Sequence, residues 1–240
     1  MKIIDKIEQK SKNLFSGDIP TIAFLGDSVT QGCFEIYLNE EKKIQTVFDG
    51  EHAYHRYLSK IFGMLYPNAP VNIINAGISG GSIRKGYERL EKDVLRFSPD
   101  LVVVSFGLND ATDFEEGLPE YKEYLSKIYD KVQERGIELI FLTENMTNTY
   151  VKYDMNEAFK KTANLTMGMQ NEGMLGKYFD AAKEVSKKYS VPVCDVYSKW
   201  LLLAKHGVDT TALLSNHINH PIRGMNWLFA YSLVETMMTN

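Results

Sequence analysis

The sequence predicts an α/β protein, a three-layer α/β/α sandwich around a five-stranded parallel sheet. Three observations support this prediction. Five short apolar runs alternate with segments of helical periodicity, the order that gives parallel strands joined by helices. The run Leu101–Phe106 is apolar on both faces, as a strand covered by two helix layers must be. The 240 residues contain no composition break and no repeat, so we expect a single domain over 1–240.

The expected strands are short runs of apolar and β-branched residues bounded by turn residues. In chain order they cover 21–25, 71–75, 101–106, 137–142 and 191–196. The last run contains Pro192, which has no backbone N–H to donate to a neighbouring strand. We therefore expect that strand at an edge of the sheet.

The expected helices have apolar residues three and four positions apart. They begin with a packing helix inside 1–18 and continue over 51–65, 82–97, 118–135, 173–189 and 197–206, with a last helix from Pro221. Ser82 is a favourable N-cap, because its hydroxyl can accept from a free N–H of the first turn. Pro221 is favoured at a first helical position, which would put His220 beside the positive end of the last helix.

Two segments lack a clear periodicity. Residues 33–50 mix apolar and charged positions, and we expect an irregular loop over the strand ends there. Residues 143–172 are polar and are expected to hold only a short helix, near 156–161. A long excursion at the end of a strand is usually functional in a compact domain, so 143–172 is predicted to border the active site.

Composition argues against several classes of protein. A formal net charge of −4 gives no reason to expect nucleic acid or an anionic membrane as partner. No apolar stretch is long enough to span a membrane, and the charged N-terminal segment is unlike a signal peptide. Cys33 and Cys194 are too few and too far apart to form a disulfide framework or a metal cluster. These features predict a cytoplasmic protein in a reducing setting.

Four polar or glycine-rich segments are expected to meet at one edge of the sheet, because parallel strands end at the same edge. Three of them follow strands and contain Ser28, Gly80 and Asn109, and the fourth contains His220. Acyl transfer to a serine needs a base for the hydroxyl proton and donors for the oxyanion. Ser28 can supply the hydroxyl and His220 the base. The Asn109 amide and the backbone N–H groups of Gly80 and Ser28 can supply the donors.

Each segment alone also fits a plain structural role. Asp27 and Ser28 fit a polar turn that closes a strand, and Gly80 fits a tight turn into a helix. Asn109 could cap the segment that follows it. We interpret Asp27 as a turn residue and Cys33 as a buried, inert thiol. Four such segments at the ends of the right elements jointly favour catalysis.

On these segments the chain resembles the SGNH (GDSL-type) hydrolase family over nearly its whole length. The matching blocks read Gly26-Asp27-Ser28-Val29-Thr30, Asn75-Ala76-Gly77-Ile78-Ser79-Gly80, Gly107-Leu108-Asn109-Asp110 and His217-Ile218-Asn219-His220-Pro221. The resemblance implies a flavodoxin-like sheet and no metal or organic cofactor. It also implies that Ser28 is the nucleophile and His220 its base. Gly80 and Asn109 would then belong to the oxyanion hole.

The last block departs from the family's usual Asp-x-x-His, because His217 stands at the aspartate position. A protonated histidine cannot replace the carboxylate that accepts the base's N–H and stabilises imidazolium. The alternatives are an unaided Ser28–His220 dyad, orientation of His220 by a backbone carbonyl or Asn216, or a carboxylate from elsewhere, such as Asp209 or Asp195. We expect a dyad whose orienting group is not a carboxylate, and His217 as a pocket-lining residue.

The sequence predicts a serine hydrolase that cleaves short-chain acyl esters through a Ser28 acyl-enzyme, with a small-molecule ester as partner. An O-acetylated carbohydrate is the first candidate. The excursion over 143–172 carries polar and aromatic groups of the kind that sugars contact: Asn145, Asn148, Tyr150 and Tyr153. A lipase- or thioesterase-like acylhydrolase is the rival enzyme. The same excursion holds methionines that would suit an acyl chain: Met146, Met155, Met167 and Met169.

Two further alternatives come from outside the hydrolases. A weakly active carbohydrate-binding module on the same scaffold would account for the missing carboxylate. A nucleotide-binding flavodoxin-like protein is disfavoured, because no phosphate-cradling glycine motif follows the first strand. Hydrolysis of a chromogenic acetate ester separates the enzyme from the binding module.

Overall fold

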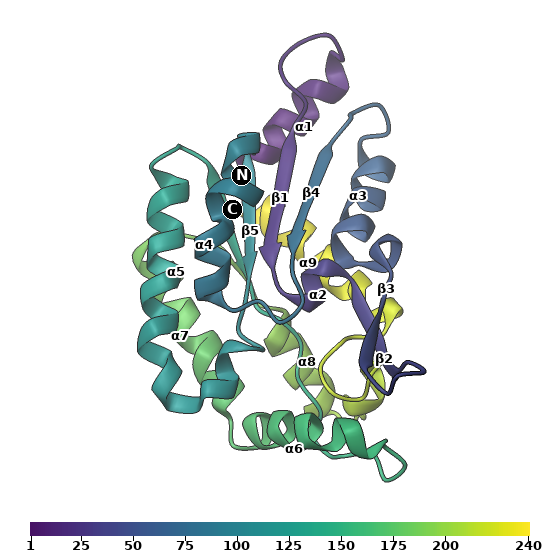
Figure 1. Ribbon diagram of the computed structural model, residues 1–240. Helices are drawn as coiled ribbons and strands as arrows, with labels where there is room; N and C mark the ends of the chain where they lie inside the picture. Colours follow the sequence, from purple (N-terminus) through teal and green to yellow (C-terminus); the bar gives the residue numbers. More distant parts are fainter.

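A five-stranded parallel sheet lies at the centre of the molecule (Figure 1). The computed structural model describes all 240 residues. The strands of the sheet are β1 (Thr21–Gly26), β4 (Asn72–Gly77), β5 (Leu101–Ser105), β6 (Glu138–Leu142) and β7 (Val193–Cys194). They lie in the order β4-β1-β5-β6-β7, and every neighbouring pair is parallel. This is the flavodoxin-like order, so the predicted fold class is confirmed, and β7 lies at the edge that Pro192 predicted.

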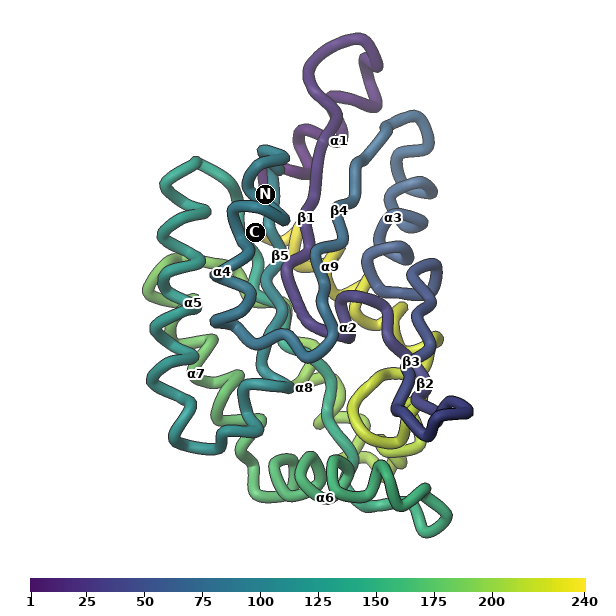
Figure 2. Tube along the Cα trace, in the orientation of Figure 1, coloured from purple at the N-terminus to yellow at the C-terminus, as the bar shows by residue number.

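Helices cover both faces of the sheet (Figure 1). One layer consists of α4 (Ile83–Asp93), α5 (Leu118–Gln133) and α7 (Met174–Lys188). In the other layer α9 (Asn226–Thr239) contacts α1 (Lys2–Lys12), α3 (Tyr54–Leu65) and α8 (Val196–Lys205). Figure 2 shows the two chain termini close together, where the Met1 amino group donates to the Asn240 carbonyl at 2.8 Å.

The centre of the sheet is the most deeply buried part of the chain. All of β5 is buried, and so are residues 22–25 of β1 beside it. Ser82 caps α4 as predicted, with its hydroxyl accepting from Lys85 N–H at 3.4 Å. The carboxyl ends of β1, β4 and β5 are therefore held by a closely packed core, which fixes whatever groups follow them.

The N-terminal packing helix is α1, which buries Ile3 and Ile7. Leu14, an apolar residue within the predicted range 1–18, lies beyond the end of the helix and is exposed. None of the helices combines the length and the apolar character that a membrane span requires.

The segment 33–50 is not an irregular loop, contrary to the prediction. It forms an antiparallel hairpin of β2 (Cys33–Leu38) and β3 (Ile44–Phe48), which stands apart from the main sheet. The hairpin has one alternating apolar stripe, but charged residues at its tip and exposed positions along β3 obscured that signal. An isolated hairpin is marginal by itself, so tertiary contacts decide this conformation.

The excursion over 143–172 contains a longer helix than expected. The helix α6 runs from Glu157 to Asn171, whereas only 156–161 was predicted. The buried face of α6 carries polar residues as well as apolar ones. The polar residues hydrogen-bond to residues 147 and 148 of the excursion. For example, Thr147 Oγ1 donates to the Thr166 carbonyl at 2.9 Å. A helix held this way leaves no hydrophobic periodicity to detect.

Candidate active site

Ser28 is the first residue of α2 (Ser28–Gln31), a single helical turn directly after β1. Asp27 caps this turn, with Oδ1 accepting from Val29 N–H at 2.9 Å. The turn lies so close to the end of β4 that a Cβ at Gly77 would come within 2.2 Å of the backbone N of Gln31. The glycine at 77 therefore lets this turn rest directly on the sheet.

The Ser28 hydroxyl lies against the His220 ring. Oγ is 3.1 Å from Nε2, although 192 positions separate the two residues in the chain. Both are buried, with 3% of Ser28 and 6% of His220 exposed. The two residues expected to act as nucleophile and base are thus in hydrogen-bonding contact.

A backbone carbonyl orients the His220 ring. Nδ1 lies 2.8 Å from the carbonyl oxygen of Phe34 in β2. A carbonyl can only accept, so Nδ1 carries the ring hydrogen and Nε2 is left to accept from the Ser28 hydroxyl. This is the tautomer that a general base for Ser28 requires.

The carboxylates considered as substitutes are engaged elsewhere. Asp195 accepts from Lys183 Nζ at 2.8 Å, and Asp209 accepts from the Tyr150 hydroxyl at 2.8 Å. Neither bonds to His220. Of the alternatives left open by the sequence, the structure contains the backbone carbonyl at Nδ1.

Asn216 supports the loop that carries His220. Its Oδ1 accepts from the N–H groups of Ile218, Asn219 and His220 at 3.0, 2.9 and 3.0 Å. His217 lies in the same turn at a φ of 53°. Its Nδ1 is 3.3 Å from the carbonyl of Thr211, and no hydrogen bond joins the residue at the usual aspartate position to His220.

Burial lowers the pKa of His220 from 6.5, although the bond to the Phe34 carbonyl and the charge of Glu35 both act to raise it. The ring is therefore held neutral, as a base must be. The positive end of the last helix, where the sequence predicted His220 to lie, would also favour a neutral ring, but that prediction of its position is wrong. The helix α9 begins only at Asn226, because Pro221 pairs with Leu214 in a β-bridge.

Of the expected oxyanion donors, some have no hydrogen-bond acceptor within the protein and others already donate to one. The Ser28 N–H is at the first position of α2, where no intrahelical acceptor exists. The Gly80 N–H has no protein acceptor, and its residue has a φ of 70° in the loop beside α2. Both N–H groups of the Asn109 amide are in use, donating to Asp27 Oδ2 and to the Gly81 carbonyl at 2.9 Å each.

Cys33 and Asp27 were both expected to have no role in catalysis, and the structure treats them differently. Cys33 is buried, which raises the pKa of its thiol to about 12 and fits an inert role. Asp27 is more than a turn residue, because it is fully buried and bonds to both Val29 and Asn109. Burial raises the pKa of Asp27 to about 6.

Sequence reasoning missed Glu144, which lies two residues beyond β6 and is fully buried. Its Oε2 accepts from Leu108 N–H at 3.0 Å, next to Asn109. Burial, followed by the charge of Asp27, raises the pKa of Glu144 well above its usual range. The available signal was an acidic residue at the carboxyl end of a strand in the predicted sheet.

A pocket of about 240 Å³ lies next to the His220 loop. The hairpin, the segment before α6, the start of α6 and the turn at 215–217 surround it. Its lining residues are Glu35, Ile36, Lys152, Asp154, Met155, Asn156, Phe159, Ser215, Asn216 and His217. His217 lines this pocket, as predicted.

Most polar and methionine residues singled out in the excursion do not face the pocket. Asn145 and Asn148 are buried, and their amides donate to the carbonyls of Asn219 and Ala163 at 2.8 and 2.9 Å. These amides hold backbone rather than present themselves to a sugar. Among the four methionines, only Met155 lines the pocket.

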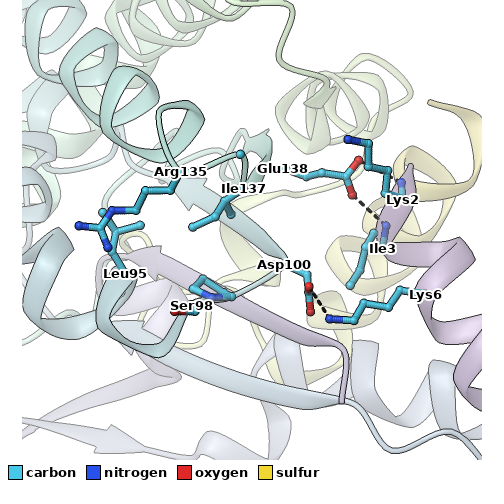
Figure 3. Close-up of a pocket in the computed structure, with 11 residues that line it drawn as sticks. Lys2, Ile3, Lys6, Leu95, Ser98, Asp100, Arg135, Ile137 and Glu138 are labelled. Carbon is cyan, nitrogen blue, oxygen red and sulfur yellow. Dashed lines mark hydrogen bonds and ion pairs between the residues drawn. The ribbon is translucent and has the colours of Figure 1, made fainter. Parts of the chain in front are cut away.

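A second cavity, of about 300 Å³, lies at the amino end of the sheet, between α1 and the starts of β5 and β6 (Figure 3). Its polar groups bond to one another. Lys6 Nζ donates to Asp100 at 2.6 Å, and Glu138 accepts from the N–H groups of Lys2 and Ile3 at 3.0 and 2.8 Å. These contacts dock α1 on the sheet, so we assign this cavity a structural role.

Comparison with known proteins identifies the family. Residues 24–222 match the model of the GDSL-like lipase/acylhydrolase family. An acetylxylan esterase from Geobacillus stearothermophilus is 27% identical over 147 residues, which are 59% of this chain and 65% of that protein. The structure of a catalytic mutant of an acetylxylan esterase from the same organism superimposes with a TM-score of 0.69 at 19% identity. That match covers 92% of this chain and 95% of the other.

A second curated relative is an uncharacterized lipoprotein of Bacillus subtilis (strain 168). It is 26% identical over 140 residues, 55% of this chain and 57% of that protein. The chain thus spans less than two thirds of the length of both curated relatives. Because one of them is a lipoprotein, the cytoplasmic location expected from composition stays a prediction.

Proposed function

The chain belongs to the GDSL-like lipase/acylhydrolase family, and we propose that it is a carboxylic ester hydrolase that removes short acyl groups through a Ser28 acyl-enzyme. The contact between Ser28 Oγ and His220 Nε2 at 3.1 Å carries this proposal. It is supported by the Phe34 carbonyl, which fixes the tautomer that can take the serine proton.

In the proposed reaction, Ser28 Oγ attacks the ester carbonyl carbon while its proton passes to His220 Nε2. The oxyanion accepts from the N–H groups of Ser28 and Gly80, and from Asn109 if its amide releases the Gly81 carbonyl. The ester's alcohol leaves with the proton from Nε2. Water then attacks the acyl-enzyme, with His220 again taking and returning a proton.

The dyad lacks a carboxylate, and this affects the imidazolium intermediate. A carbonyl dipole stabilises the positive ring less than a full negative charge does. Glu35, the residue after Phe34, adds a negative charge nearby, although Arg223 holds that carboxylate at 2.6 Å. Because the tautomer is correct, we expect a working enzyme rather than the severe loss that a wrong tautomer causes.

We propose an O-acetylated carbohydrate as the substrate class, with the pocket beside His217 receiving the sugar. Seven of its ten lining residues are polar or charged, and Phe159 offers an aromatic face. A polar rim around one aromatic residue suits a polyhydroxylated leaving group better than an acyl chain. The acetylxylan esterase among the relatives points the same way.

A fluorophosphonate probe tests the proposed nucleophile directly. We expect one adduct, mapped by mass spectrometry to the peptide that contains Ser28, and none in His220→Ala. A wild-type protein that takes no label and hydrolyses no p-nitrophenyl acetate, yet binds xylo-oligosaccharides, would instead favour the binding module.

A series of p-nitrophenyl esters from C2 to C12 tests the acyl preference. We expect kcat/KM to be highest for the acetate and to fall as the chain lengthens. Highest turnover of the long esters would favour the lipase-like alternative. Release of acetate from acetylated xylo-oligosaccharides, lowered in Phe159→Ala mainly through KM, would support the sugar pocket.

A further inference from the structure

We propose that Glu144 is a positioning residue that keeps a proton at neutral pH and donates it in a hydrogen bond to Asp27, directly behind the nucleophile. Its effect on turnover rests on the proposed function, whereas the protonated carboxyl itself does not. Neither residue has a place in the acyl-transfer steps described above.

The geometry of the two carboxyl groups carries this proposal. Both side chains are fully buried; Asp27 bonds to Asn109 and Glu144 to the neighbouring Leu108, and a side-chain hydrogen bond between the two carboxyls contributes to the pKa of each. Glu144 Oε2 accepts from Leu108 N–H at 3.0 Å, whereas Oε1 has no donor. Two ionised carboxylates offer only acceptors and cannot bond to each other. A single proton on Glu144 turns this contact into a hydrogen bond.

The charge of Arg89 lowers the pKa of Asp27, but its guanidinium bonds to neither carboxyl. The guanidinium of Arg89 donates to the carbonyls of Gly26 and Ala76 at 2.8 and 2.5 Å rather than to either carboxyl. Its remaining partner is Asp93. The other titratable groups near the pair bring no positive charge: Asp110 on the segment after β5, Tyr54 on α3, Tyr121 on α5 and Cys33 on β2.

Burial acts on the two groups unequally. Burial raises the pKa of Asp27 to about 6, against hydrogen bonds and the charge of Arg89, which lower it. For Glu144 burial and the charge of Asp27 act in the same direction, and its pKa lies well above the usual range of a carboxyl. The donors favour the same order: both Asp27 oxygens accept from N–H groups, whereas Glu144 Oε1 has no donor, so the charge lies on Asp27 and the proton on Glu144.

The shared proton joins three parts of the site. Ionised Asp27 accepts from Val29 N–H at the start of α2 and from the Asn109 amide, both at 2.9 Å. Protonated Glu144 accepts from Leu108 N–H, next to Asn109. The pair thus ties the nucleophile's turn to the loop after β5, and loss of the proton would drive the two apart by charge repulsion.

The pH dependence of stability in Glu144→Gln tests the proton. A carboxyl that keeps its proton when folded but loses it when unfolded makes the folded state less stable as pH rises. The glutamine variant lacks this proton. The ratio of its folding equilibrium constant to that of the wild type should therefore rise about tenfold per pH unit from about pH 5 upward. Glu138→Gln, at a carboxyl that bonds to two backbone N–H groups and touches no second carboxyl, is the matched control.

A stability difference that stays flat with pH in Glu144→Gln would overturn the proposal. An independent measurement is the infrared difference spectrum at pH 7 between the wild type and Glu144→Gln: it should contain a C=O band of a protonated carboxylic acid that only the wild type has, whereas a band of Asp110, whose pKa burial raises to about 7, is common to both and cancels. Absence of that band would also overturn the proposal. Both measurements hold whether or not the protein hydrolyses esters, so they separate this proposal from the proposed function.

Turnover tests the positioning role. Glutamine can donate to Asp27 and accept from Leu108, so Glu144→Gln should keep kcat for p-nitrophenyl acetate within about threefold at pH 7. Glu144→Leu cannot donate, and we expect kcat to fall at least about tenfold with little change in KM. Equal kcat losses in the two variants would contradict a donor role for Glu144.

Discussion

The two ends of the central sheet treat carboxyl groups in opposite ways. At the amino end, Asp100 and Glu138 bond to a lysine and to backbone N–H groups, at the partly exposed cavity beside α1 (Figure 3). At the carboxyl end, Asp27 and Glu144 are fully buried, without a cation bonded to either. Asp110 is buried beside them with Oδ2 unpaired, and burial raises its pKa to about 7.

This difference separates groups that stabilise the fold from groups that cost stability. A charged group that is paired and partly hydrated loses little solvation free energy on folding, whereas burial of a carboxyl without a cation opposes folding. Clusters of such costly groups gather at functional sites. We therefore expect the chemistry at the carboxyl end of the sheet, whereas the contacts at the amino end dock α1.

The largest expected effect is the loss of activity when Ser28 or His220, at the carboxyl end of the sheet, is replaced. Ser28→Ala and His220→Ala should each lower kcat for p-nitrophenyl acetate by at least about 10³-fold, because each removes half of the dyad. His217→Ala, in the same loop as His220, is the matched control and should keep most of the activity. Near wild-type turnover in Ser28→Ala would contradict the mechanism.

A smaller effect comes from the glycine beneath the nucleophile's turn. Gly77→Ala puts a Cβ 2.2 Å from the backbone N of Gln31, so α2 must move. We expect a loss of about 2–4 kcal/mol in the free energy of unfolding, together with a lower kcat. Gly63→Ala, where a Cβ on α3 meets nothing within 4 Å, should stabilise the protein by about 0.5–1 kcal/mol. Denaturant unfolding of both variants measures these opposite signs.

The acid limb of the pH–rate profile tests whether His220 is the group that must be neutral for activity. Burial lowers the pKa of His220 from 6.5, so kcat/KM should fall only below that pH. The Glu35 charge raises this pKa, and Glu35→Gln should therefore move the limb to still lower pH. Glu41→Gln, at the tip of the same hairpin, should leave the limb in place. A limb that does not move in Glu35→Gln would belong to a group other than His220.

The smallest effect is expected at the amino end. Lys6 and Asp100 form an ion pair whose side chains are 32% and 25% exposed. Lys6→Ala should cost at most about 1 kcal/mol of stability, less at high salt, because partly exposed pairs are screened. It should leave kcat unchanged. A clear loss of turnover in this variant would break the division between the two ends.

The parts of the fold that the sequence predicted are those with a repeating apolar signal. The five strands and the layered helices bury apolar residues at regular spacing, so the pattern survives in the sequence. The apolar stripe of the hairpin over 33–48 is interrupted by charged and exposed positions, and most of α6 is held by polar contacts, so neither leaves a clear pattern. The start of α9 was misplaced because Pro221 fits a β-bridge as well as a helix.

The same limit applies to the candidate site. Side chains with distinctive chemistry, Ser28 and His220, could be brought together from topology alone. The Phe34 carbonyl could not, because every residue has a carbonyl and only the folded hairpin shows which one is near His220. Glu144 was missed because its partner, Asp27, was interpreted as a turn residue.

The use of a main-chain oxygen at His220 Nδ1 predicts where this protein tolerates mutation. A side-chain carboxylate can be lost by a single substitution, whereas the Phe34 carbonyl remains whichever amino acid stands at position 34. Substitution scanning should therefore find no orienting residue at that position. Insertion or deletion of one residue in β2 is different, because successive carbonyls in a strand point in opposite directions. Insertion or deletion of one residue in β2 should therefore remove the orienting carbonyl, whereas point changes at the buried Phe34 should act through stability.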